Sequence, residues 1–268
     1  MQDASIIQQS YSNKRVKSIV VAAHFDDVEF MAYSAIAHSI SSEDGIAAVI
    51  VTNGGNSPRT GKYADTSDQD MVQLRIQEQL HAAQLAQYSK TTMLMYPSWV
   101  VKDCSPQLIQ QLADIISDDP DVVVYTHNPF DKHPTHVAVC KAVVAAIKSL
   151  PSLSRPKRLI GCEVWRGLDW MLDQYKIPMD TSDNHDFAKA LFGVFESQIQ
   201  GGKNYGNAVI GRWISNATFY DSHGVDKYTS LSYGVDMTPL ATEQDMTLAQ
   251  FAKRYLDDFA NSVLDSLK

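Results

Sequence analysis

The sequence predicts an α/β domain with a mainly parallel sheet that carries helices on both faces. Two observations predict this fold class. Short apolar runs rich in β-branched residues alternate with helical patterns up to about residue 160, and the runs are bounded by turn residues. The chain has 268 residues, 44% of them hydrophobic, which is enough for one large core. We expect one domain over 1–268, with an α/β core at 16–165 and pocket-covering elements at 166–268.

The expected elements follow one another along the chain. Residues 1–15 are polar and are expected to be loose. The apolar runs predict strands at 16–23, 46–52, 92–96, 122–126 and 158–162. Helical patterns and start signals predict helices at 27–41, 67–88, from 105 onward, 135–150, 189–198 and 247–267. Residues 201–237 are rich in Gly, Asn, Tyr and Ser, and we expect a long, partly ordered region that covers or lines a pocket.

Charge and composition exclude several classes of function. The net charge of −8 gives no basic footprint for nucleic acid and no attraction to an anionic membrane surface, so we expect a small or neutral substrate as partner. Three cysteines without CxxC spacing predict neither a thiolate zinc site nor a disulfide framework. No signal peptide or long apolar stretch is visible, and the expected location is the cytoplasm.

Two polar clusters follow predicted strands. The first, His24-Phe25-Asp26-Asp27, follows the run 18–23, and the second, within 126–136, follows the run 121–125. Because ligands of parallel sheets bind at the carboxyl ends of strands, we expect both clusters to form one site. The glycine pattern of a dinucleotide-binding turn does not follow the first strand, which argues against a nucleotide.

The residue types predict a metal-dependent hydrolase. His24, Asp27 and His136 form a His₂Asp set that leaves an open position for water, as in catalytic zinc sites. Zn²⁺ is the first expectation, while Fe²⁺ and cobalt also suit these ligands. Asp26 is the predicted general base for a metal-activated water. His133, if protonated, would stabilise the oxyanion of a tetrahedral intermediate. Alternatively, the paired aspartates only complement a helix dipole, and His127 is structural or contacts substrate.

On these motifs the chain resembles the LmbE-like (PIG-L) family of zinc-dependent N-deacetylases. The family's His-Pro-Asp-Asp-x-Glu motif corresponds to residues 24–29 and its His-Pro-Asp-His motif to 133–136; Arg-x-x-Glu at 75–78 and Lys189 to Gln198 match more loosely. The resemblance implies a Rossmann-like fold, that of the LmbE-like deacetylases, and removal of an N-acetyl group from a GlcNAc-type amino sugar or conjugate. It implies His24, Asp27 and His136 as the metal ligands. It also implies Asp26 and His133 as the catalytic pair, and a homo-oligomer.

The resemblance leaves two residues with two interpretations each. Arg75 is implied as a substrate contact, and the alternative is a surface salt bridge with Glu78. Glu29 is either an outer partner of a metal-bound histidine or a complement to the helix dipole.

The chain departs from the family pattern at three places. Phe25 replaces the usual proline, and Phe30 with its neighbours replaces a glycine-rich helix start, which predicts a bulkier pocket floor. Thr135 replaces the usual aspartate, so His133 should be protonated less often, unless Asp131 substitutes as an outer partner. Thr135 and Phe25 favour an alternative function, a non-catalytic sugar-binding or regulatory module with a retained metal site. A metal-dependent phosphoesterase is disfavoured, because the sequence shows neither a basic pocket signature nor a second carboxylate-rich metal cluster.

Overall fold

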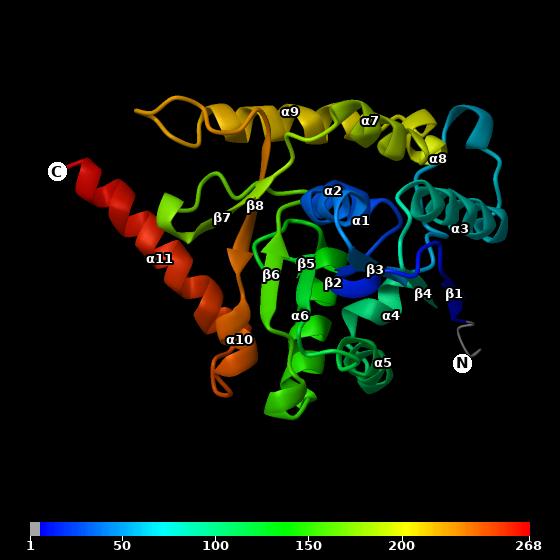
Figure 1. Cartoon of the computed structure of the whole chain (residues 1–268), viewed down its shortest axis with the longest axis horizontal. Coiled ribbons are helices and arrows are strands. Elements are labelled where there is room, and N and C mark those ends of the chain that lie inside the picture. Colours follow the sequence, from blue (N-terminus) through cyan, green and yellow to red (C-terminus); the bar gives the residue numbers. More distant parts are fainter. Residues whose placement is uncertain (1–5) are drawn as a thin grey trace.

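The computed structural model describes residues 6–268 and centres on one eight-stranded mixed sheet (Figure 1). The strands are β1 Ile7–Gln9, β2 Arg15–Ala22, β3 Asp44–Thr52, β4 Lys90–Tyr96, β5 Val123–His127, β6 Arg158–Cys162, β7 Lys176–Asp180 and β8 Leu231–Asp236. Their order is β1-β4-β3-β2-β5-β6-β8-β7. The central five strands of this order, β4-β3-β2-β5-β6, are parallel to one another. Strands β1, β7 and β8 pair antiparallel at the two edges.

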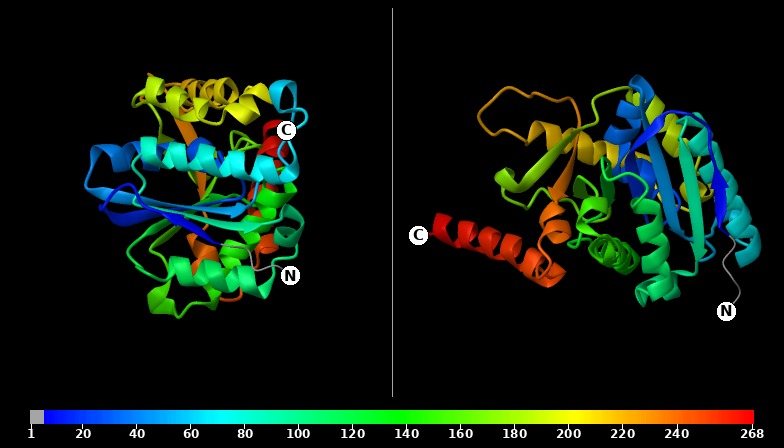
Figure 2. Two further views of the ribbon diagram at one scale, coloured as in Figure 1. Left: turned by 90° about the vertical axis from the view of Figure 1, so that its right-hand side faces the viewer. Right: turned by 60° about the horizontal axis from the view of Figure 1, so that its bottom comes forward.

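Helices cover both faces of the sheet, as the sequence predicts (Figure 2). They are α1 Asp27–Met31, α2 Tyr33–Ser41, α3 Asp68–Leu85, α4 Ser98–Lys102, α5 Pro106–Ile116, α6 Pro134–Ser149, α7 His185–Gly193, α8 Glu196–Gln200, α9 Tyr205–Thr218, α10 Thr238–Thr242 and α11 Leu248–Ser266. Alternate residues of β2 enter different cores: Ile19 and Val21 pack toward α4 to α6, while Val20 and Ala22 pack toward α1 to α3. No helix within residues 6–268 is long and apolar enough to span a membrane.

The parallel core creates a crevice beside β2. From β2 the chain adds β3 and β4 on one side, and then returns to add β5 and β6 on the other. The strand order therefore reverses between β2 and β5, which are direct neighbours with Val21 opposite Thr126. Ligands of open α/β sheets bind at such a switch point, outside the carboxyl ends of the strands.

Several expected elements are corrected by the structure. Residues 1–15 were expected to be loose; 1–5 lie outside the described residues, but Ile7–Gln9 forms β1 against β4. The helix expected at 27–41 is broken at Ala32, which has φ −126° and ψ 27°. No proline or glycine causes this break. It lets Phe30 and Tyr33 both pack their rings against Phe192 of α7.

The C-terminal third is more regular than its composition predicts. Residues 201–237 contain α9 and β8 rather than a long, partly ordered region. In α9 the residues Ile210, Trp213 and Ala217 form a buried stripe at helical spacing, which the many glycines and asparagines around them make hard to recognise in the sequence. The unpredicted β7 contains Pro178, which an edge strand tolerates because one side of it needs no ladder hydrogen bonds. The helix expected at 189–198 is two helices, α7 and α8.

Candidate metal centre

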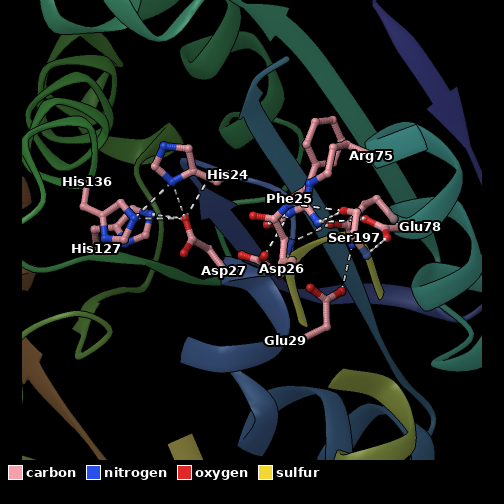
Figure 3. Close-up of polar contacts among 12 residues, drawn as sticks. His24, Phe25, Asp26, Asp27, Glu29, Arg75, Glu78, His127, His136 and Ser197 are labelled. Carbon is pink, nitrogen blue, oxygen red and sulfur yellow. Dashed lines mark hydrogen bonds and ion pairs between the residues drawn. The ribbon is translucent and has the colours of Figure 1, made fainter. Parts of the chain in front are cut away.

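The two polar clusters meet at the switch point between β2 and β5 (Figure 3). His24 lies two residues beyond the end of β2, and His136 lies in the first turn of α6, which follows β5. Asp26 has φ 86°, a left-handed conformation that is uncommon for a residue other than glycine. This turn sends the Asp27 side chain toward the histidines and the Asp26 side chain toward Arg75. Backbone strain of this kind gathers at functional sites.

Three ligand atoms form a nearly equilateral triangle. Asp27 Oδ2 lies 3.1 Å from His24 Nδ1 and 3.1 Å from His136 Nε2. The two ring nitrogens are also 3.1 Å apart. Ligand atoms about 2.0–2.1 Å from a tetrahedral zinc ion lie about 3.3 Å from one another. The spacing and the N₂O donor set therefore fit a divalent transition metal held by His24, Asp27 and His136.

The charges around His136 favour a cation at the same point. Asp27 lies beside its Nε2, and Asp131 Oδ2 lies 3.3 Å from its Nδ1. Burial opposes a charge on this ring, yet the two carboxylates raise the pKa of His136 to about 9. Burial would likewise raise the pKa of Asp27, but the histidines around it hold that pKa well below its usual range. A metal ion supplies the positive charge that these carboxylates favour, and the Asp131 contact is one that metal-bound histidines commonly make.

His127 and His133 flank the triangle in different ways. His127 Nε2 accepts a hydrogen bond from the Ala23 backbone N–H at 2.8 Å, and its ring stacks on His136 with centroids 3.9 Å apart. Because Nε2 of His127 already accepts this hydrogen bond, it is not available as a metal ligand. Its stacked ring supports the ring of His136. His133 faces the pocket, 4.8 Å from the His24 ring centroid. Burial and the charges of His136 and His24 lower its pKa to about 4, which makes it neutral at pH 7.

Asp26 is held by a buried ionic network on the other side of the turn. Arg75 donates to Asp26 Oδ2 at 2.8 Å, to the Phe25 carbonyl at 2.6 Å and to Glu78 Oε2 at 2.7 Å. Glu78 also accepts hydrogen bonds from the backbone and hydroxyl of Ser197. Burial raises the pKa of Asp26 to about 7, although Arg75 acts in the opposite direction. A carboxylate with this pKa is suited to proton transfer near neutral pH.

The structure shows the partners of Arg75 and Glu29. Arg75 is only 2% exposed, so its pair with Glu78 is not a surface salt bridge. Within residues 6–268 Glu29 contacts no histidine: its Oε1 accepts from Gln79 and from the Tyr88 hydroxyl, both at 2.8 Å. Burial raises the pKa of Glu29 to about 8, so it is mostly protonated at pH 7 and complements the helix dipole little.

A cavity of about 730 Å³ opens onto the cluster, a size common for small-molecule sites. Its lining includes His24, Asp26 and His133, and also Arg75 and Phe30. A second part of its wall is formed by Lys102, Lys132, Trp165, Gln198, Lys203, Tyr205 and Arg212. The sequence analysis assigned a role in the site to none of these side chains, although Lys203, Tyr205 and Arg212 belong to the region 201–237 that was expected to cover or line a pocket. Lys132 could have been placed near the site from the sequence, because it directly precedes His133. The other wall residues lie on segments whose arrangement depends on long-range packing.

Asp131 contacts a different histidine from the one expected. Its Oδ1 accepts from the His133 backbone N–H at 2.9 Å, but its Oδ2 contacts the ring of His136. The same Oδ2 accepts from the Trp165 backbone N–H at 3.1 Å. Asp131 therefore connects a candidate metal ligand to the pocket wall, rather than acting as the ring partner of His133.

Comparisons with known proteins concern the family and the fold of the chain. Residues 19–147 match the PIG-L family model, described as GlcNAc-PI de-N-acetylase. An uncharacterised deacetylase of Escherichia coli K12, YaiS, is 28% identical over 149 residues, which cover 54% of this chain and 75% of the relative.

Among solved structures, the N,N'-diacetylchitobiose deacetylase of Pyrococcus horikoshii has a TM-score of 0.60 at 17% identity and covers 82% of this chain and 83% of its own. GalB of Pseudomonas putida, a 4-carboxy-2-hydroxymuconate hydratase, has a TM-score of 0.63 at 15% identity and covers 83% of this chain and 96% of its own. The fold therefore occurs with more than one chemistry. Residues 19–147, which contain both strand-exit motifs, therefore match a PIG-L/LmbE family domain, and the chain shares the fold of LmbE-like deacetylases.

Proposed function

We propose that this protein is a metal-dependent N-deacetylase that hydrolyses the acetamide of an N-acetylated amino sugar or its conjugate. The observation that carries the proposal is the triangle of His24, Asp27 and His136 ligand atoms beside Asp26 in the floor of an open cavity. The family description and the deacetylase relative support amide hydrolysis over the hydration reaction that also occurs with this fold. Zinc is our first choice of metal, and Fe²⁺ suits the same ligands.

The residues around the triangle have distinct roles in this reaction. A divalent ion, when bound, supplies a Lewis acid for the acetyl carbonyl and acidifies a water. Asp26 accepts a proton as the water oxygen adds to the carbonyl carbon. Cleavage of the C–N bond then transfers that proton to the leaving amine, so that acetate and the free amine are released. His133, neutral at pH 7, donates a ring N–H hydrogen bond toward the developing oxyanion.

Arg75 acts on the reaction through Asp26 in this scheme. Its guanidinium already donates to Asp26, Glu78 and the Phe25 carbonyl, so it fixes the direction of the base. A contact between Arg75 and substrate remains a prediction, since Arg75 also lines the cavity.

Acetate release from a panel of GlcNAc conjugates, measured together with metal content, tests the proposal. Asp26→Asn should lower turnover by about 10²- to 10⁴-fold while the metal stays bound, because the amide can still accept from Arg75 but cannot take a proton. The exposed Asp245→Asn is a matched control and should behave as the wild type. Full turnover in Asp26→Asn would refute the base assignment. Sugar binding with a bound metal and no acetate from any conjugate would instead favour the binding module.

A further inference from the structure

The outer wall of the cavity carries four cationic side chains, Lys102, Lys132, Lys203 and Arg212, which we call the cationic rim. We propose that the cationic rim recognises a negatively charged group, a carboxylate or a phosphate, on the N-acetylated substrate. This inference rests on the proposed function and names the class of substrate on which the enzyme acts. The sequence showed no basic pocket signature, because these four residues come from four separate segments of the chain.

The acidic residues of the cavity do not neutralise the rim. Its lining contains two carboxylates, Asp26 and Asp27, and both have partners already. Asp26 pairs with Arg75, and Asp27 faces the histidines. None of the four rim cations forms an ion pair within 4 Å in residues 6–268, although the buried Glu163 lies near enough to Arg212 to interact with its charge. The three rim lysines therefore carry the unpaired positive charge. The rim is therefore a local excess of positive charge on a chain whose net charge is −8. A cleft lined by one sign of charge concentrates ligands of the opposite sign.

Trp165 brings two of the cations together beside the catalytic residues. The Nζ atoms of Lys132 and Lys203 lie 5.8 Å and 5.5 Å from the centre of its ring. The same ring lies 5.8 Å from the His133 ring. Two ammonium groups held near one indole repel each other, and an anion bound near both relieves that repulsion.

The backbone around Trp165 is fixed, so the rim has a defined place relative to the reacting atoms. Asp131 accepts from the Trp165 N–H and contacts the ring of His136. Arg212 of α9 donates to the carbonyl of Val164, the residue before Trp165. A substrate whose acetamide reaches His133 and Asp26 therefore passes along the indole, and a charged group on its far side meets Lys132 and Lys203.

A matched pair of substrates isolates the charge. The carboxymethyl and carbamoylmethyl glycosides of GlcNAc have nearly the same shape, but only the first is anionic. We expect the ratio of their kcat/KM values to favour the anion by about tenfold at low salt and to shrink at high salt, because the rim lysines are exposed. Lys132→Gln and Lys203→Gln should each lower this ratio about threefold. Lys189→Gln, an exposed lysine of α7 that does not line the cavity, should leave the ratio unchanged.

A second pair, the 1-phosphate and the methyl glycoside of GlcNAc, gives the preference for a phosphate. Whichever is larger, this preference or that for the carboxymethyl glycoside, identifies the kind of anion that the rim recognises. The rim proposal would be overturned if charged and uncharged substrates released acetate at equal rates in the wild type and in both rim variants. The proposed function would then still stand. If no substrate releases acetate, the proposed function fails, and calorimetric binding of the same glycosides still decides on the rim. A preference for the carboxymethyl glycoside that is lost in Lys203→Gln supports the proposal; equal affinity, or no binding, refutes it.

Discussion

Glu29 gives the sharpest test of the electrostatics behind the candidate site. Its carboxyl group is fully buried, Oε1 accepts two hydrogen bonds, and Oε2 has no partner within residues 6–268. Burial raises its pKa from the ordinary 4.5 to about 8. The folded state therefore holds a proton that the unfolded chain releases between pH 4.5 and pH 8. The free energy of unfolding should fall as pH rises through this window, and the full penalty is present above pH 8.

Glu29→Gln removes this titration and keeps the shape of the protonated side chain. One pKa unit corresponds to about 1.4 kcal/mol, so the variant should gain on the order of 4 kcal/mol of stability over the wild type between pH 5 and pH 9. Urea unfolding of both proteins at several pH values, after dialysis against a chelator, measures this difference. Glu243→Gln, at an exposed position, is the control. A difference between Glu29→Gln and wild type that stays constant within about 1 kcal/mol over this range would refute the account of Glu29.

Two further substitutions test the metal triangle and the ionic network. His136→Ala should lose the bound ion, because only His24 and Asp27 remain as ligands. Metal content per chain after gel filtration measures this loss. A variant that keeps one ion per chain contradicts the ligand set. Arg75→Met should cost about 3–5 kcal/mol in urea unfolding, because it leaves the carboxylates of Asp26 and Glu78 buried without a counter-charge. Arg15→Met, whose ion pair with Asp119 is exposed, should change little, and equal losses in the two variants would argue against the buried network.

The sequence was most informative where one physical rule dominates. Strands buried on both faces are continuous apolar runs, so β2, β3 and β5 could be located from composition. The polar residues that follow two of these runs meet at one edge of the sheet because the strands are parallel neighbours. His24, Asp27 and His136 could therefore be grouped before any coordinates.

Features that depend on distant contacts could not be predicted in this way. Arg75 is buried because Asp26 and Ser197, 49 and 122 residues away in sequence, both reach it. Burial by segments so far apart leaves no local pattern in the sequence. The antiparallel strands β7 and β8 are short and mixed in composition, and only pairing with β6 and with each other makes them strands.

The family match ends at residue 147, whereas Trp165, Lys203, Tyr205 and Arg212 lie beyond it. Part of the wall assigned to substrate choice, including Trp165 and two of the four rim cations, is thus encoded outside the stretch that carries the metal triangle, whereas Lys102 and Lys132 lie within it. Mutations after residue 147 can accumulate without touching the metal triangle, so natural selection can exchange one substrate for another while hydrolysis is preserved. A chimera that keeps residues 19–147 and takes its C-terminal third from a relative should inherit the relative's substrate preference.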